Sequence, residues 1–311
     1  MSILVVGSVA FDSISTPHGT VDRCLGGAAT HFALAASFFT QVRVIGVVGE
    51  DFTSEQEAVF QARGIDIQGI ERTAGKCFHW TGEYLENLNE AHTLRTDLNV
   101  FERFQPKIPE AYRDSEFLFL ANIDPVLQQQ VRKQMPKVRM VCGDTMNYWI
   151  TGHRENLLGV LQGLDALLIN DGEAKLLAGE TNLVQAAKRI MEMGPKTLIV
   201  KQGEYGATAF FGDNSFSMHV KNRFFHAPAL PLAEVVDPTG AGDSFAGGFF
   251  GYLASQPQVT PSVFKRAMFY GGVMGSFAVE RFGTERIRQL TREEIDQRFA
   301  AFRELSHLDA E

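Results

Sequence analysis

The stretch Val235–Phe250, which reads VVDPTGAGDSFAGGFF, combines glycines and carboxylates in a way that could do chemistry. It opens with Asp237 and other turn-forming residues, and Gly240 and Gly242 permit backbone conformations that a Cβ disfavours. A helical pattern follows, so Gly240, Ala241 and Gly242 should lie where a helix leaves its first N–H groups unpaired. Such a helix end attracts anions.

Asp243 adds a carboxylate in the first turn of the same expected helix. This combination suits phosphoryl transfer, because the N–H groups would stabilise the moving phosphoryl group and Asp243 would accept the proton of the attacking hydroxyl. The alternative is a glycine-rich turn in which Asp243 merely favours the helix start. A short glycine motif alone does not decide between the two.

The elements that must position this segment alternate along the chain. Short apolar runs predict buried strands at Ile3–Val6, Val42–Val48, Phe117–Leu120, Val138–Cys142, Ala166–Ile169 and Thr197–Val200. Helical patterns occur at Ala28–Phe39, Ser54–Arg63, Asp124–Gln134, Asn156–Leu164, Leu183–Met193, Ala241–Ala254, Pro261–Phe282 and Thr291–Leu305. This alternation predicts an α/β protein with a doubly wound, mostly parallel sheet flanked by helices.

Two helix starts carry the spacing of a capping box. These are Ser54 with Glu57, and Thr291 with Glu294.

Two polar segments interrupt the alternation. Residues of about 12–25 and 76–104 show local β alternation, as in FHWTGEYL, and we expect them to form a small accessory sheet on one domain that spans residues 1–311.

Composition bounds the class of protein. The chain has 311 residues, of which 45% are hydrophobic, so a long disordered chain is not expected. The formal net charge of −8 argues against a nucleic-acid or membrane-surface binder, although a local anion site stays open. Three scattered cysteines, no signal-peptide pattern and no long apolar stretch predict a cytoplasmic protein.

The longer string DPTGAGDSFAGGF closely resembles the signature of the PfkB (ribokinase-like) carbohydrate kinase family. Further family-like motifs occur in family order, namely GSVAFD from Gly7, GGAATH from Gly26, NDGE from Asn170 and KQGEYG from Lys201. The resemblance implies a ribokinase-like fold in which the accessory sheet is a lid over the substrate.

The resemblance also implies the roles of the signature residues. Asp243 would be the catalytic base, and Gly240, Ala241 and Gly242 would form an anion hole for the γ-phosphoryl group of ATP. By the same resemblance, Asn170 and Glu173 would act on Mg²⁺ mainly through water. The spacing of this second pair equally fits a helix N-cap and a first-turn acid.

Other roles implied by the resemblance concern the two substrates. Asp12, Gly26 and Gly27 would contact the acceptor. On the nucleotide side the implied residues are Lys201, Gly203, Gly206, Gly272 and Ser276. The last two fall where the family encloses adenine, but small residues there would also suit tight helix packing.

Departures from the ribokinase pattern bear on the acceptor. Ala10, Ala28 and His31 stand where ribokinases tend to carry Asn, Lys and Asn, so a true ribokinase is not expected. His31 is a candidate acceptor contact from its place in the motif, with a buried core histidine as the alternative. The segment from Asp144 resembles a DxN motif of sugar-acid kinases, with a spacing that differs by one residue.

Asn122 follows an expected strand, and open α/β sheets bind ligands at the carboxyl ends of their strands. We therefore expect Asn122 on the substrate side as well.

These observations predict an ATP- and Mg²⁺-dependent kinase that phosphorylates a hydroxyl of a sugar or sugar derivative. The alternatives are a nucleoside kinase of the same fold and a non-catalytic binding protein that kept the fold. A Rossmann dehydrogenase is not expected, because GSVAFD after the first strand lacks the GxGxxG spacing. The expected assembly is a monomer or a homodimer formed through the lid.

Overall fold

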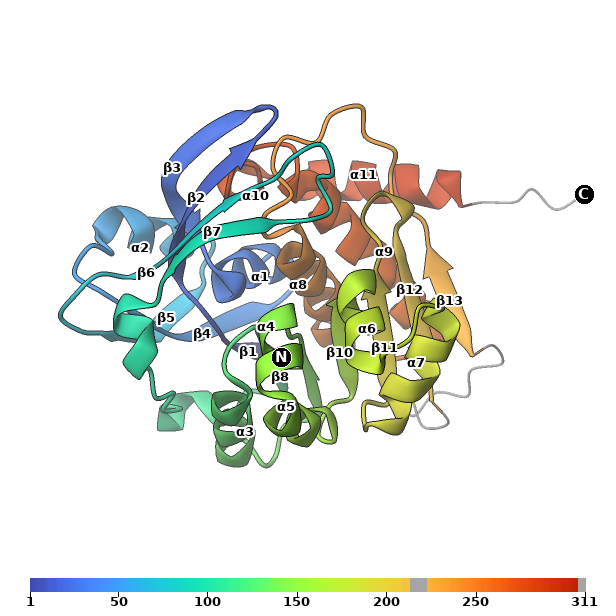
Figure 1. Ribbon diagram of the computed structural model, residues 1–311, viewed down its shortest axis with the longest axis horizontal. Helices are drawn as coiled ribbons and strands as arrows, with labels where there is room; N and C mark the ends of the chain where they lie inside the picture. The colour runs from blue at the N-terminus through green and yellow to red at the C-terminus, as the bar shows by residue number, and fades with distance from the viewer. Residues whose placement is uncertain (213–222, 307–311) are drawn as a thin grey trace, which may run out of the picture.

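A nine-stranded sheet dominates the computed structural model, which describes residues 1–212 and 223–306 (Figure 1). The strands from β11 to β5 run parallel to their neighbours, and β12 and β13 add an antiparallel edge. Their spatial order is β13 (Phe224–Ala227), β12 (Ala207–Phe211), β11 (Thr197–Lys201), β10 (Ala166–Asn170), β9 (Met140–Gly143), β8 (Phe117–Leu120), β1 (Ser2–Val6), β4 (Gln41–Val48) and β5 (Asp66–Arg72).

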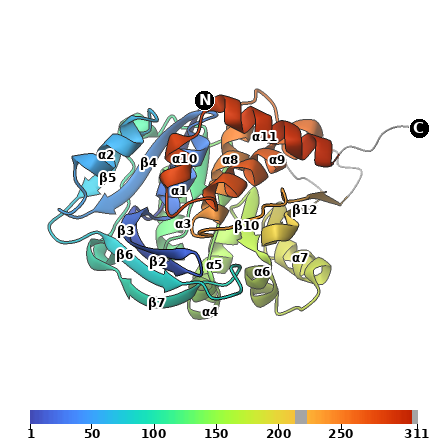
Figure 2. The same cartoon turned by 90° about the horizontal axis from the view of Figure 1, so that it is seen from above.

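Helices cover both faces of this sheet (Figure 2). Ile3 and Val5 of β1 join a core with residues of α1, α8 and α9, and Leu4 and Val6 join a second core with residues of α3, α5, α6 and α7. Because both faces of the central strands are buried, β1, β8, β9 and β10 consist almost entirely of apolar residues. The predicted doubly wound, mostly parallel sheet is confirmed.

The helices are α1 (Ala28–Ala36), α2 (Ser54–Gln61), α3 (Pro125–Gln134), α4 (Asn147–Gly152), α5 (Arg154–Leu161), α6 (Asp171–Ala178), α7 (Leu183–Glu192), α8 (Ala241–Ala254), α9 (Pro261–Ala278), α10 (Glu285–Gln289) and α11 (Arg292–Leu305).

A separate four-stranded sheet, called the lid sheet below, combines two distant parts of the chain. Its order is β3 (Gly19–Gly26), β2 (Ala10–Thr16), β6 (Phe78–Glu83) and β7 (His92–Asp97). The two hairpins are antiparallel, and β2 pairs in parallel with β6. The separate accessory sheet expected from the sequence is therefore present.

Helix α9 ends at Ala278 and not at the expected Phe282. The carbonyl of Val279 accepts hydrogen bonds from the N–H groups of Val236 and Asp237, at 2.8 and 3.3 Å. The chain that leads into the glycine-rich loop is thus tied to the end of α9. In residues 1–212 and 223–306, no helix is both long enough and apolar enough to cross a membrane.

Candidate active site

The glycine-rich loop ends in the N-terminus of α8. Gly240 is the N-cap residue and has the left-handed conformation, with φ 72°. Its carbonyl accepts from the Ser244 N–H at 2.8 Å, and the Ala241 N–H donates to Pro238 at 3.2 Å. In the part of the chain that the structure describes, no acceptor pairs with the N–H groups of Gly242 and Asp243. The first turn of α8 therefore offers free donors to an anion.

His31 of α1 packs directly against this turn. A Cβ on Gly240 would overlap the imidazole ring, so Gly240 is required for space as well as for its positive φ. The His31 side chain is 1% exposed, and neither ring nitrogen has a hydrogen-bond partner among the described residues. Burial lowers the pKa of His31 to about 4, which keeps the ring neutral near pH 7.

Lys201, at the end of β11, brings a cation to the same turn. Its Nζ atom lies 2.7 Å from the position that a Cβ on Gly242 would occupy. The ammonium group opposes the effect of burial on the pKa values of Asp243, Asp144 and Glu173. Backbone donors and one side-chain cation thus converge at the start of α8.

Asp243 and Asp144 form a carboxyl pair beside that cation. Burial raises the pKa of both groups, and each carboxyl influences the pKa of the other. Asp144 follows β9 and is 6% exposed, and its Oδ1 atom has no partner among the described residues. Such a pair favours a shared proton. The sequence pattern relates the segment from Asp144 to a DxN motif that follows a strand, but it does not assign Asp144 to the site beside Asp243.

Asp12 lies on β2 of the lid sheet and is 5% exposed. A Cβ on Gly26 would overlap its carboxylate, and the adjacent Gly27 has φ 94°. Burial raises the pKa of Asp12 to about 7, and the charges of Asp237 and Asp243 add to the rise. The expected acceptor contact is therefore electrostatically coupled to the expected base.

This raised pKa predicts the effect of Asp12→Asn on stability. The folded state binds the Asp12 proton more tightly than the unfolded chain, so the stabilisation is present at low pH and is lost as the pH rises through about 7. At about pH 8 we expect Asp12→Asn to stabilise the fold by roughly 2–4 kcal/mol, and at about pH 4 by little. Urea unfolding at the two pH values measures this. A variant less stable than the parent at the higher pH would contradict it.

Asn170 and Glu173 close a capping box at the start of α6. The Glu173 N–H donates to Asn170 at 2.7 Å, and the Asn170 N–H donates to the Glu173 carboxylate at 2.8 Å. The helix-cap interpretation is thus realised, and one carboxylate oxygen of Glu173 stays free of this bond. Burial raises the pKa of Glu173, while Lys201 opposes the rise.

The oxygen donors around Lys201 suit Mg²⁺ in type. Asp144, with its unpartnered Oδ1, and Glu173 would be the residues that hold the ion. In the described ranges, however, no cluster of three or more His, Cys, Asp or Glu side chains is arranged to bind a metal. Mg²⁺ would therefore keep most of its waters and take oxygens from phosphate groups.

Some expected site residues have other partners. The Asn122 side chain donates to the sulfur of Met146 at 3.1 Å and accepts from Trp149 at 2.9 Å. Asn122 is thus bound to the α4 region, and no described contact joins it to the signature turn. Gly203 and Gly206 have positive φ in the turn between β11 and β12, and a Cβ on Gly206 would overlap the Ala227 carbonyl.

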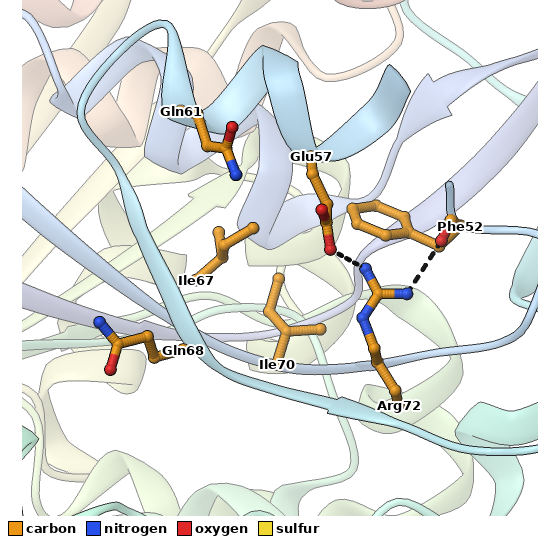
Figure 3. A pocket seen from close by; sticks show the side chains of 7 residues that line it. All are labelled: Phe52, Glu57, Gln61, Ile67, Gln68, Ile70 and Arg72. Carbon is orange, nitrogen blue, oxygen red and sulfur yellow. Dashed lines mark hydrogen bonds and ion pairs between the residues drawn. The ribbon is translucent and has the colours of Figure 1, made fainter. Parts of the chain in front are cut away.

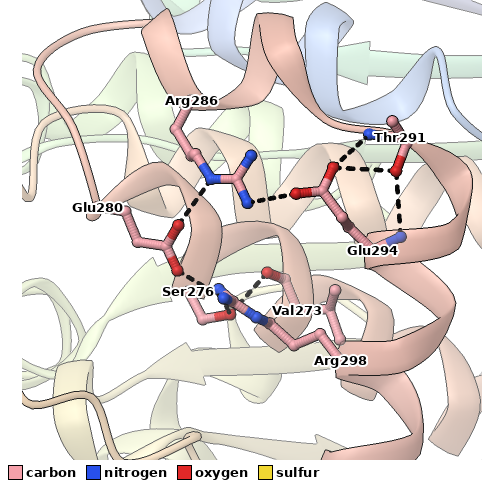
Figure 4. Close-up of polar contacts among 7 residues, drawn as sticks. All are labelled: Val273, Ser276, Glu280, Arg286, Thr291, Glu294 and Arg298. Carbon is pink, nitrogen blue, oxygen red and sulfur yellow. Dashed lines mark hydrogen bonds and ion pairs between the residues drawn. The ribbon is translucent and has the colours of Figure 1, made fainter.

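The two residues expected near adenine face α11. A Cβ on Gly272 would lie 3.2 Å from the Phe302 ring. The Ser276 hydroxyl donates to the Val273 carbonyl at 2.8 Å and accepts from Arg298 at 3.3 Å (Figure 4). In the same figure, Arg298 of α11 also pairs with Glu280, just after α9, and Arg286 of α10 pairs with Glu280 and with Glu294 of α11. These contacts favour the helix-packing alternative for this pair.

A groove of about 240 Å³ lies between α2 and β5, at the edge of the sheet away from α8 (Figure 3). Arg72 in this groove pairs with Glu57 and donates to the Phe52 carbonyl at 3.0 Å. The guanidinium of Arg72 therefore already has two partners within the protein. None of the expected site residues lines the groove.

A comparison with protein-family models shows the family to which this chain belongs. The family model described as pfkB family carbohydrate kinase matches residues 2–289. The chain belongs to this family. The expected resemblance and the ribokinase-like fold are thereby confirmed, and this pfkB protein is a kinase by its family.

Individual relatives span both acceptor classes. The pfkB protein is 27% identical over 264 residues to a cytidine kinase of Thermococcus kodakarensis, covering 83% of this chain and 90% of that protein. It is 35% identical over 248 residues to a 2-dehydro-3-deoxygluconokinase of Thermoproteus tenax, covering 73% and 72%.

A solved structure shows the same fold. It is the aminoimidazole riboside kinase from Salmonella enterica in complex with aminoimidazole riboside and an ATP analog, with a TM-score of 0.74 and 18% identity. The match covers 96% of this chain and 100% of that chain.

Proposed function

We propose that this protein uses ATP and Mg²⁺ to phosphorylate a hydroxyl group of a sugar or sugar derivative. The observation that carries the proposal is the start of α8. Asp243 lies in the first turn, the N–H groups of that turn are free, and Lys201 reaches the same turn. A base, an anion site and a cation are together what phosphoryl transfer requires.

Asp243 acts as the base. Its carboxylate accepts the proton of the attacking hydroxyl as the oxygen forms its bond to phosphorus, and ADP carries away the electrons of the broken bond. The raised pKa of Asp243 suits this role, because it brings the carboxyl closer to the working pH. Asp144 interacts electrostatically with Asp243, and in this proposal it holds the orientation of that side chain.

The Gly240–Gly242 segment stabilises the transferring group with its backbone donors. Lys201 adds a positive charge beside Gly242. Bound Mg²⁺ would neutralise phosphate charge, with Glu173 and Asp144 as its protein partners. Asn170 holds Glu173 in place through the capping box. The turn that carries Gly203 and Gly206 faces the nucleotide in this proposal.

The acceptor lies between α1 and the lid sheet. Asp12 binds its hydroxyls, the backbone at Gly26 and Gly27 lies close to it, and His31 offers two unpartnered ring nitrogens. A small rotation of the neutral His31 ring would let it donate or accept one hydrogen bond. Asn122, Gly272 and Ser276 remain sequence predictions.

A nucleoside acceptor is the second candidate. It is favoured by the 27% identity to a cytidine kinase over most of both chains and by the absence of the ribokinase residues at Ala10, Ala28 and His31. Both candidates use the same base and the same anion site. They differ only in the group that the lid sheet covers.

A thermal-shift panel separates the candidates. We expect Mg·ATP to raise the melting temperature by about 2–5 °C, and one acceptor class among ribose, fructose, 2-dehydro-3-deoxygluconate, adenosine and cytidine to do the same. Asp12→Asn should remove the acceptor shift and keep the Mg·ATP shift. A shift with a nucleoside and with none of the sugars would overturn the sugar proposal.

A further inference from the structure

Tyr84 joins the lid sheet to the glycine-rich loop. It follows β6 and is 9% exposed, and its backbone N–H donates to Ser15 of β2 at 2.8 Å. Its hydroxyl accepts a hydrogen bond from the Thr239 hydroxyl at 3.2 Å. Thr239 stands directly before Gly240, so a side chain fixed to the lid contacts the loop that forms the anion site.

The partner of Tyr84 is itself held rigidly. The Thr239 N–H donates to Asp237 at 2.8 Å, and the other oxygen of that carboxylate accepts from the Gly283 N–H at 2.8 Å. Asp237 is fully buried, and these two bonds satisfy one lone pair on each oxygen. The hydroxyl of Tyr84 therefore contacts a loop whose conformation is fixed by Asp237.

Two further contacts join the lid sheet and its β6–β7 connection to the segments around the glycine-rich loop and Gly203. The Thr16 hydroxyl of β2 donates to the Val236 carbonyl at 2.8 Å. Asn89, between β6 and β7, lies so close to Gly203 that a Cβ there would overlap its side chain. The lid thus contacts the chain on both sides of the expected phosphate site.

We propose that Tyr84 is a positioning residue that couples closure of the lid to nucleotide binding at the start of α8. The inference rests on the proposed function. When the anion site is filled, the free N–H groups of the Gly240 loop gain a partner, which stabilises the loop in the position where the Thr239 hydroxyl donates to Tyr84. The lid then closes over the acceptor and excludes water from the transfer. Burial raises the pKa of Tyr84, so the hydroxyl stays protonated throughout the physiological range.

Hydrogen–deuterium exchange of residues 82–90 tests this coupling, with and without Mg²⁺ and the non-hydrolysable analogue AMP-PNP. In the parent protein we expect the analogue to slow exchange in this segment. In Tyr84→Phe we expect about fivefold faster exchange without ligand, the size of effect given by loss of one neutral hydrogen bond, and little further response to the analogue. Residues 237–243 should still be protected by the analogue in both proteins.

Two variants make the test specific. Tyr252→Phe removes a hydroxyl from the far end of α8, where no hydrogen bond to it is described, and should behave as the parent. Thr239→Val should reproduce Tyr84→Phe, and the double variant should add nothing.

Unchanged exchange in Tyr84→Phe would overturn the inference, as would protection of residues 82–90 that persists in this variant. Protection of residues 237–243 alone in the parent overturns the inference and leaves the nucleotide site standing. Protection at neither segment overturns both the inference and the proposed nucleotide site.

Discussion

Asp243→Asn is expected to lower kcat by about 10³-fold and to leave the affinity for Mg·ATP within about threefold of the parent. The amide keeps the size of the side chain and the backbone donors of the turn, but it cannot accept the hydroxyl proton. Steady-state kinetics with the acceptor found in the panel, together with calorimetric titration of AMP-PNP, measure both quantities. Turnover within about tenfold of the parent would show that Asp243 is not the base.

The matched control is Asp296→Asn on α11. Asp296 is half-exposed and pairs with Arg292 in the preceding turn of the same helix. Its replacement should leave kcat unchanged. The pH profile adds a second readout, since Asp243 must be deprotonated to act. Activity should fall as the pH drops, with its midpoint above the usual value near 4 for an aspartate, because burial raises the pKa of Asp243.

Gly240→Ala is expected to lower kcat/KM for Mg·ATP by about 10²–10³-fold. Two effects combine. A Cβ at φ 72° strains the backbone, and the same atom would overlap the His31 ring. The loop or α1 must therefore move, which displaces the N–H groups from the phosphoryl group.

Gly179→Ala separates these effects. Gly179 has φ 66° at the end of α6, and a Cβ there would meet nothing within 4 Å. It therefore carries the same backbone strain without the overlap and without the site. We expect it to be somewhat less stable and to keep full activity. If Gly240→Ala folds and is no less active than Gly179→Ala, the anion hole is not at Gly240.

The sequence predicts the elements well where the pattern is local. The strand Phe117–Leu120 and the helix Ala241–Ala254 have the predicted bounds, and the capping box of Thr291 with Glu294 is present. An apolar run buried on both faces and a helix start after glycines need no distant partner to be recognised.

The prediction of a capping box at Ser54 was wrong, because Thr53 caps α2 together with Gln56. Both residue pairs have the required spacing. Glu57 instead pairs with Arg72 on β5, a strand that the sequence patterns did not predict. The choice between the two caps thus depends on a tertiary contact.

The candidate site likewise combines features that are local in the sequence with contacts that arise only from the fold. The glycine-rich turn and Asp243 are adjacent in sequence and could be assigned from it. The approach of His31 to Gly240, of Lys201 to Gly242 and of Tyr84 to Thr239 joins residues far apart in the chain, and these contacts are visible only in the fold. The approach of Asp144 to Asp243 likewise joins residues that are far apart in the sequence.

The most direct test of the account is to identify the product of the reaction by mass spectrometry. The protein is incubated with Mg·ATP and each acceptor of the thermal-shift panel, beside Asp243→Asn. We predict that one acceptor gains a single phosphoryl group, that ADP forms in equal amount and that the variant forms about 10³-fold less of both in the same time. A protein that binds Mg·ATP but phosphorylates no acceptor of the panel, or an Asp243→Asn variant within about tenfold of the parent, would contradict the account.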